Sequence, residues 1–357
     1  MKHVSTKQQP AAMGICLCLF FVLALSCKKF EDHFPTHNYQ QTNLVANLQS
    51  YNPMHIDKSL LNAWGIAVAP SGPVWISANH SGLTTIYDKT GATLLAPVSI
   101  PGPGHSQGAP TGVVFNPTAD FIIPGTTMKS RFIFAGEDGI ISGWAGGPAA
   151  MIAANKGTST VYKGLELGND GTGNFLYATN FRKARIDVFD KNFKQVNNKP
   201  FSDPSIPKGF APFNIRSING FLYVTYAKQK APDDMDDESG PGNGYINIFT
   251  MKGELVKRFA SQGALNSPWG MVGAMPGFCD VDDAIIVGNF GDGRINVFDK
   301  WGHFEGQLKQ HGGNQPVTIE GLWALDNTPV IATSKQLFFT AGPADESDGI
   351  FGMLERK

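Results

Sequence analysis

Gly104-His105-Ser106-Gln107-Gly108 has the Gly-x-Ser-x-Gly spacing of the nucleophile elbow of hydrolases. That chemistry needs a serine strained into exposure on a strand-to-helix turn, with an acid and a histidine following along the chain. Pro101-Gly102-Pro103 precedes the pentapeptide and Ala109-Pro110 follows it, so no helix is expected to begin there. We therefore expect a flexible loop between two strands, and we predict no catalytic serine.

An acidic segment further along the chain imitates the start of a calcium-binding loop. Asp234, Asp236 and Glu238 alternate with other residues and are followed by Gly240. A calcium loop of this type needs its glycine one place earlier, and a closing glutamate where Tyr245 stands here. The spacing therefore favours a solvated acidic insertion between two strands over a metal site.

The composition indicates many short strands rather than helices. The 357 residues include 41 glycines, 23 prolines and 25 phenylalanines, which are spread along the chain. Such usage is typical of strands joined by tight turns, and long amphipathic helical stretches are missing. The net charge of -1 and the dispersed basic residues provide no basic face for phosphate groups. We therefore predict no binding to nucleic acid.

The first 27 residues have the features of a processing segment that does not belong to the fold. A basic start is followed by an uncharged apolar run over Met13–Leu25, which is short for a bilayer span of about 20 residues. The segment Leu23–Cys27 resembles a bacterial lipobox, although Ala24 stands where the strict pattern prefers Leu. We predict that cleavage leaves Cys27 lipidated. The alternative is an ordinary signal peptide that is cut nearby.

These boundaries predict the organisation of the whole chain. Residues 1–27 form a lipoprotein-type signal peptide, residues 28–38 a polar tether, and residues 39–357 one folded domain. Only Cys279 remains in the folded part, which therefore has no internal disulfide and depends on a large core. We expect an exported lipoprotein of a cell envelope, on the periplasmic side of an outer membrane or at the cell surface.

A repeated unit decides the architecture. One recurring piece is a strand of alternating apolar and polar residues that ends in a hairpin turn. Its copies are Thr85–Gly91, Ile186–Lys191, Ile246–Gly253 and Ile295–Gly302. A second piece is a short strand around a Gly or Asn, and its anchors are Gly65, Gly112, Gly164, Asn214, Gly270 and Gly321, which are 47, 52, 50, 56 and 51 residues apart. Six units of this length predict an all-β fold, a six-bladed β-propeller with four strands in each blade.

The last unit is incomplete, and this predicts how the ring closes. The second strands of the blades are expected at Val74–Ser77, Arg131–Ala135, Phe175–Thr179, Phe221–Tyr226, Ala284–Gly288 and Val330–Thr333. In blade six the third strand is expected at Ile350–Met353, and too few residues follow it to form a fourth. We predict that the N-terminal segment Tyr39–Leu48 supplies this outer strand and removes an open sheet edge.

The chain resembles NHL-type six-bladed propellers, whose blades carry the same strand and Asp-containing hairpin. More specifically, it resembles an uncharacterised family of secreted bacterial propellers, members of which often bear PEP-CTERM-type sorting tails. The segments that carry the resemblance are Asn43–Val45, Leu61–Ile66, Pro110–Gly112, Asn180–Asp190, Gly288–Asn296 and Glu320–Leu325. It covers about residues 39–355 and departs from the family at the C-terminus, where no sorting tail follows. The resemblance implies the fold and an envelope location, but the family has no established activity.

The propeller geometry predicts which side chains surround one mouth of the central channel. The innermost strand of each blade begins at the face where the loop between strands two and three emerges. By the repeat alignment, the innermost strands contribute Trp64, Thr111, Lys163, Phe213, Trp269 and Glu320. The loops contribute Asn79, His80, Glu137, Asp138, Asn180, Arg182, Asn289, Asp292 and Arg294. Aromatic surface with a few polar groups is the usual composition of a ligand pocket. The structural alternative is that the tryptophans wedge between blades and the asparagines cap turns.

Three functions are compatible with this mouth. The main prediction is a non-catalytic module, displayed on the envelope as a monomer, that binds a protein, a glycan or a small molecule there. A metal-dependent hydrolase of lactonase type, or a lyase, would hold a divalent cation such as calcium between Glu320, Asn79, Asn180 and Asn289. A purely architectural envelope protein would use no site at all. No motif fixes a reaction, so the sequence leaves enzymatic activity undecided.

Overall fold

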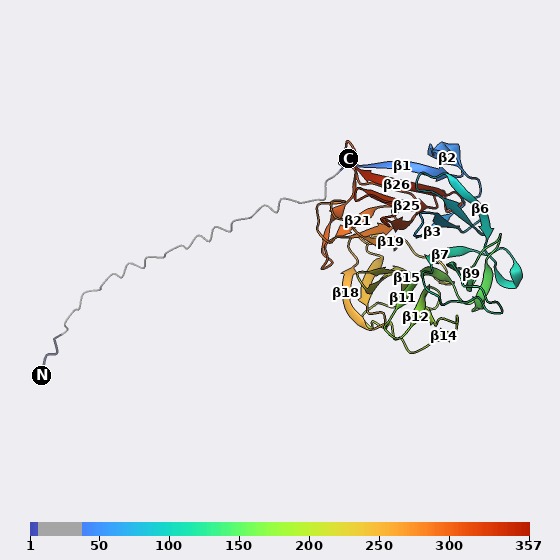
Figure 1. Cartoon of the computed structure of the whole chain (residues 1–357). Helices are drawn as coiled ribbons and strands as arrows, with labels where there is room; N and C mark the ends of the chain where they lie inside the picture. Colours follow the sequence, from blue (N-terminus) through green and yellow to red (C-terminus); the bar gives the residue numbers. More distant parts are fainter. Residues whose placement is uncertain (6–37) are drawn as a thin grey trace. The chain divides into compact units, whose positions relative to one another are not determined.

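The computed structural model describes residues 1–5 and 38–357, and the second range forms a ring of six β-sheets (Figure 1). This confirms the predicted all-β, six-bladed propeller. The only helical segments within these ranges are two short 3-10 turns, η1 (Gln49–Tyr51) and η2 (Pro103–His105). None of the helices described there is long and apolar enough to span a membrane. Cys27 and nearly all of the expected signal peptide and tether lie outside the described residues, and those assignments stay predictions.

Blades one to three each consist of four antiparallel strands that follow one another from the channel outward. Blade one contains β3 (Ala63–Val68), β4 (Val74–Ala78), β5 (Leu83–Tyr87) and β6 (Thr93–Ser99). Blade two contains β7 (Pro110–Phe115), β8 (Phe132–Gly136), β9 (Ile140–Trp144) and β10 (Met151–Asn155). Blade three contains β11 (Tyr162–Asn169), β12 (Asn174–Asn180), β13 (Arg185–Phe189) and β14 (Gln195–Val196).

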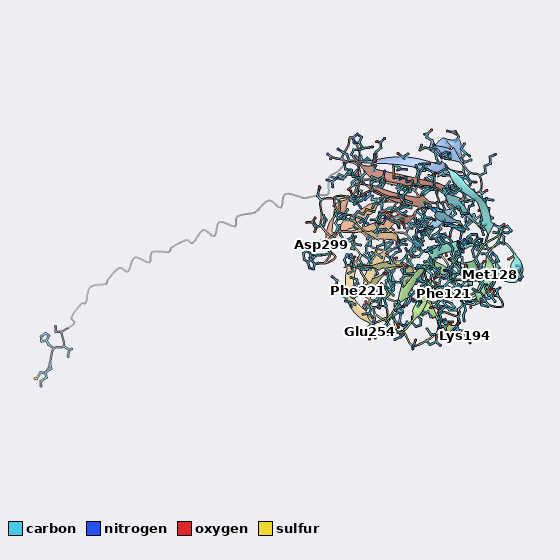
Figure 2. The ribbon with its side chains drawn as sticks, viewed as in Figure 1. Phe121, Met128, Lys194, Phe221, Glu254 and Asp299 are labelled. Carbon is cyan, nitrogen blue, oxygen red and sulfur yellow. The ribbon has the colours of Figure 1, made fainter. Side chains whose placement is uncertain are left out.

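Blades four and five repeat this order, whereas blade six is assembled from both ends of the domain. Blade four contains β15 (Phe210–Ile218), β16 (Phe221–Lys228), β17 (Gly244–Phe249) and β18 (Leu255–Ser261). Blade five contains β19 (Pro268–Gly273), β20 (Ile285–Asn289), β21 (Ile295–Phe298) and β22 (Phe304–Gln307). Blade six contains β24 (Leu322–Asp326), β25 (Gln336–Ala341), β26 (Ile350–Arg356) and β1 (Asn38–Ala46), and β1 is flanked by β2 (His55–Ile56) and β23 (Lys309–Gln310). Figure 2 labels Lys194, Glu254 and Asp299, which lie near hairpin turns on the periphery of the ring.

The N-terminal strand closes the ring as predicted. β1 pairs antiparallel with β26, with Tyr39 opposite Arg356 and Ala46 opposite Ile350. The Thr340 hydroxyl of β25 then donates a hydrogen bond to the carbonyl oxygen of Trp64 in β3, which joins blade six to blade one. Because β1 covers the outer edge of β26, the last blade has as many main strands as the others.

Close approach between innermost strands explains the anchor glycines. A Cβ atom at Gly65 would lie 2.4 Å from the carbonyl oxygen of Thr111, and one at Gly270 would lie 2.6 Å from that of Trp323. Contacts this short are not tolerated, so neighbouring blades can meet here only without a side chain on these anchors. The contact between Gly270 and Trp323 also identifies the anchor of blade six. Ala324 follows Trp323 in the same way that the anchor Gly112 follows Thr111.

Two predictions for blade six were wrong. Gly321 is not the anchor, because it precedes β24 and adopts a left-handed φ of 66°. The second strand is β25 (Gln336–Ala341) and not Val330–Thr333. The apolar run Val330–Ala332 lies in a turn, where the Ile331 amide donates to the Thr328 carbonyl over 3.0 Å. Short buried apolar runs look the same in turns and strands, which is why the pattern misled here.

Candidate functional site at the channel mouth

A stack of aromatic rings crosses the channel just inside the predicted mouth. Phe290 stacks on Trp323 with ring centroids 3.9 Å apart, and Trp323 stacks on Trp64 at 3.7 Å. Trp269 meets both tryptophans edge-on, at 5.9 and 6.4 Å. Trp64 and Trp323 are each only 1% exposed. Behind the rings the channel narrows to a cavity of about 10 Å³, roughly enough for one water molecule, so any larger ligand would have to bind on the outer side of the stack.

A buried lysine lies against this stack. The Lys163 side chain, at the start of β11, is 2% exposed, and its ammonium lies 5.0 Å from the ring centre of Trp64. Its Nζ atom is 2.5 Å from Glu137 Oε1 and 3.3 Å from Asp236 Oδ1. Burial opposes the charge on Lys163, but the carboxylates of Glu137 and Asp236 outweigh it and raise the pKa to about 12. Lys163 is therefore a permanent cation at the floor of the mouth.

The carboxylates, in contrast, face outward. Glu137 lies in the turn between β8 and β9, and its side chain is 23% exposed. Asp236 lies in the connection between β16 and β17, and its side chain is 72% exposed. Since both cover the Lys163 ammonium, a molecule that approaches from solvent meets carboxylate oxygens and not the lysine.

Glu346 adds a third carboxylate from blade six. Burial raises its pKa to about 7, against the lowering effect of Lys163, and the Glu137 carboxylate contributes in the same direction as burial. Asn62 donates to Glu346 Oε2 over 2.6 Å and accepts from the Trp323 indole over 2.8 Å, which connects the carboxylate to the aromatic stack. A carboxyl group whose pKa lies near neutral beside other charged groups is typical of functional sites.

The backbone that holds Glu346 is strained. Three consecutive residues without the freedom of glycine, Ala344, Asp345 and Glu346, have left-handed φ values of 56°, 51° and 65°. Each costs roughly 1 kcal/mol relative to a right-handed conformation. Strain of this kind persists where the surrounding structure holds it, and here it places the Glu346 carboxylate in the mouth.

The structure brings several of the predicted residues together. Trp64, Lys163, Phe213 and Trp269 all lie at or behind the floor of the mouth, and all are buried. Asn79 joins the cluster because its amide donates to Glu137 Oε2 over 3.0 Å. Most of the innermost set is therefore buried at the floor of the mouth, and these side chains do not form its rim.

Other predicted residues lie apart from this cluster. The hydroxyl of Thr111 is buried and donates to the Tyr162 carbonyl over 2.9 Å, which links blades two and three. Glu320 is exposed, and its carboxylate accepts from the Ala344 amide over 3.0 Å. Its expected place in the ring belongs to Trp323, because Ala324 is the anchor. His80 and Arg294 are exposed, and Arg182 donates to the Thr158 carbonyl over 3.1 Å.

The four weak metal candidates have separate partners. The Asn180 amide donates to Asp187 Oδ2 over 2.8 Å, and that of Asn289 donates to the Ala264 carbonyl over 2.8 Å. Asn79 is committed to Glu137 and Glu320 to the backbone of blade six. In residues 1–5 and 38–357, no group of three or more His, Cys, Asp or Glu side chains is arranged to hold a metal ion. The asparagine contacts use the amide nitrogens and not the Oδ1 atoms that would bind calcium, so a calcium site on these four residues stays a prediction.

The structure also shows the surroundings of the Gly-x-Ser-x-Gly pentapeptide and of the acidic segment. The expectation that no helix begins here was wrong, because the short 3-10 turn η2 begins at Pro103. The Ser106 hydroxyl donates to the Pro103 carbonyl over 2.9 Å. In the acidic segment, Glu238 pairs with Lys228 at 2.7 Å while Asp236 turns to Lys163. The segment is an insertion between two strands, as expected, but one of its carboxylates belongs to the mouth.

Sequence reasoning missed five residues of the mouth. One is Phe290, which directly follows the predicted Asn289. The sequence placed Asp236 only in an acidic insertion. Trp323 was not predicted, because the wrong anchor in blade six assigned its place in the ring to Glu320. Asn62 and Glu346 carried no signal, because both lie in irregular connections with left-handed φ values of 46° and 65°. Their positions depend on the register of neighbouring blades, which the repeat does not encode.

No protein-family model matches the chain, but two viral proteins are similar along most of it. The uncharacterised protein L690 of Acanthamoeba polyphaga mimivirus is 35% identical over 331 residues, which cover 88% of this chain and 85% of that protein. The uncharacterised protein R648 of the same virus is 33% identical over 326 residues, which cover 87% and 79%. Both relatives are viral, so a bacterial origin and sorting tails gain no support from them.

Solved structures share the fold at low sequence identity. Virginiamycin B lyase from Staphylococcus aureus has 13% identity and a TM-score of 0.53, covering 90% of this chain and 99% of that one. Soluble aldose sugar dehydrogenase from Escherichia coli has 14% identity and a TM-score of 0.51, covering 90% and 100%. At such identities the likeness shows a common propeller fold and nothing about activity.

Proposed function

The chain belongs to the family of the uncharacterised mimivirus proteins L690 and R648, and from its channel mouth we propose that it is a monomeric, non-catalytic binding module for a cationic ligand. The observation that carries this proposal is the layering of charge. The ammonium of Lys163 is covered by the carboxylates of Glu137 and Asp236, which reach solvent, and the partly buried carboxylate of Glu346 interacts with it electrostatically.

The ligand that fits this arrangement bears an ammonium or guanidinium group. Three carboxylates and one lysine leave the mouth with an excess of negative charge once Glu346 is ionised. Phe290, which is partly buried, ends the aromatic stack and offers a ring face to a cation. Lys163 itself shows that an ammonium is accommodated between carboxylates and an indole at this place. Lysine side chains, free amines and polyamines share this chemistry.

Calorimetric titration with the tripeptide Lys-Lys-Lys at pH 8 and low salt tests the proposal. We expect saturable binding that Asp236→Asn and Glu346→Gln each weaken about fivefold, the range for one partly exposed charge. Glu254→Gln is the matched control, because Glu254 is exposed in a hairpin turn on the periphery (Figure 2). No binding of Lys-Lys-Lys, equal binding of Glu-Glu-Glu, or equal losses in all three variants would refute it.

A second candidate is an enzyme that acts at the same mouth, and the pKa of Glu346 favours it. A carboxyl group with a pKa of about 7 can donate or accept a proton at neutral pH. Turnover of any substrate that rises and falls around pH 7 and disappears in Glu346→Gln, with the fold intact, would establish this function. A metal-dependent hydrolase, lactonase or lyase would in addition show a higher melting temperature with calcium.

The location is a separate proposal that rests on the sequence alone. We propose that the chain is exported and anchored by a lipid on Cys27, which would place the propeller a short polar tether from a membrane. Metabolic labelling with a fatty acid tests this. Label that is present in the natural chain and absent in Cys27→Ser supports the anchor, and label that is absent from both contradicts it.

A further inference from the structure

A second cleft lies between blades one and two, at the opposite end of the strands from the Lys163 mouth. It is bounded by the turn between β3 and β4, the ends of β7 and β9 and the start of β8. Lys163 and Glu137, in contrast, lie at the start of β11 and in the turn that follows β8. Antiparallel strands alternate in direction, so these segments mark the other face of the ring. Figure 2 labels Met128, which precedes Lys129 in the chain, at the periphery of the ring.

The cleft has an aromatic floor. Trp75 stacks on Phe132 with ring centroids 4.0 Å apart and contacts Trp144 at 4.6 Å, and Phe115 packs edge-on against Phe132 at 5.4 Å. The volume of about 430 Å³ lies in the range of small-molecule sites. At its rim, Leu95 is 49% exposed. Trp75 and Phe132 are almost fully buried and Trp144 is 8% exposed, so the rings are fixed by packing. A flat apolar group would contact the partly buried Phe115 and the exposed edge of Trp144.

The charges on the lining have one sign. Lys129 and Arg131 are exposed at the edge of the cleft, and none of its lining residues is acidic. Neither side chain forms an ion pair with any other residue that the structure describes, whereas Lys163 at the channel mouth is paired with Glu137 and Asp236. Two unpaired cations beside an aromatic floor are complementary to a molecule with a flat apolar body and one anionic group.

We propose that this cleft is a second ligand site, for an amphipathic organic anion such as an aromatic carboxylate or sulfonate. The apolar body would lie against Phe115 and Trp144, and the anionic group would meet Arg131 and Lys129. The site is independent of the channel mouth in position and opposite to it in charge, so the two would not compete for the same ligand.

Binding of the fluorescent anion 1-anilinonaphthalene-8-sulfonate tests the proposal. We expect saturable binding to the full chain, with energy transfer from tryptophan, and at least a fivefold weaker affinity in the double variant Lys129→Gln/Arg131→Gln. The double variant Lys191→Gln/Lys252→Gln removes the same charge from exposed hairpin turns of other blades and serves as the control. A second variant, Leu95→Glu, places a negative charge at the rim and should also weaken binding.

Four results would contradict a separate anion site in this cleft. The first is an absence of saturable binding, and the second is an equal affinity in the Lys129→Gln/Arg131→Gln variant and the natural chain. The third is equally tight binding of the uncharged analogue N-phenyl-1-naphthylamine, which would show an apolar crevice without anion recognition. Displacement of the dye by Lys-Lys-Lys would also contradict a site that is separate from the channel mouth.

Discussion

The two ends of the central channel are built from the same six innermost strands but bury charge differently. At the mouth, Lys163 is 2% exposed and is surrounded by carboxylates from several blades. At the other end, Arg216 of β15 keeps 29% of its side chain exposed and meets one carboxylate, Asp326, at 3.4 Å. The strands are equivalent, so the difference comes from the connections that insert Asp236 and Glu346 at one end only. Irregular connections on a regular scaffold are where binding residues are usually found.

The largest expected effect comes from removing the buried cation. Lys163→Met should lower the free energy of unfolding by about 3 kcal/mol at pH 8, because it leaves crowded carboxylates without their counter-charge. Arg216→Met should cost less, about 1–2 kcal/mol, because Arg216 is partly exposed and the buried Asp326 carboxylate also accepts from the Thr328 amide. Urea denaturation of both variants measures the difference. Equal losses would mean that the two ends do not differ in the way described.

The pH dependence of stability isolates Glu346. Its pKa is about 7 in the folded chain against an ordinary 4.5, so between these values the folded state keeps a proton that the unfolded state releases. Stability from this group is complete below pH 4.5 and is lost as the pH rises through 7. Glu346→Gln should therefore be more stable than the natural chain by about 1 kcal/mol at pH 8, and equal to it at pH 4. A difference that does not change with pH would contradict the raised pKa.

Relieving the strained turn at Ala344, Asp345 and Glu346 should raise the free energy of unfolding by a smaller amount. Ala344 adopts a φ of 56°, which glycine tolerates better than alanine, so Ala344→Gly should stabilise the chain by roughly 0.5 kcal/mol. Thermal denaturation can detect this gain. A loss of stability would mean that the turn is not held in the left-handed conformation.

The smallest effect concerns the residue that the repeat alignment placed in the ring. Glu320→Gln should leave the affinity for Lys-Lys-Lys unchanged, because Glu320 is exposed and bonds to the Ala344 amide beside the mouth. The titration described for Asp236→Asn provides the scale. A loss of affinity as large as in Asp236→Asn would show that Glu320 contributes to binding.

The architecture could be predicted from the sequence because its determinants are local. Alternating strands, hairpin turns and glycines at the closest approach of blades recur in most units, and the incomplete last unit identified the need for β1 in blade six. Blade six was the exception, since Gly321 imitates an anchor while Ala324 is small enough to serve as one. Alignment of the repeats therefore misassigns the anchor where alanine replaces glycine at the close approach between blades.

The site was predictable only as far as the repeat extends. Trp64, Lys163 and Trp269 occupy equivalent positions on innermost strands, and Glu137 lies in an equivalent turn, so alignment found them. Asp236 and Glu346 lie in connections whose paths depend on packing between distant blades. No spacing in the sequence reports such contacts, which is why the carboxylates that distinguish the mouth came only from the structure.

A crystal structure of the chain grown with Lys-Lys-Lys at pH 8 would show directly whether the channel mouth binds a cationic ligand. We expect one ammonium group of the peptide outside the aromatic stack, within hydrogen-bond distance of the carboxylates of Asp236 and Glu346. Lys163 should still be paired to Glu137. A peptide bound elsewhere on the surface, or a mouth without peptide at concentrations that saturate binding in solution, would contradict this expectation.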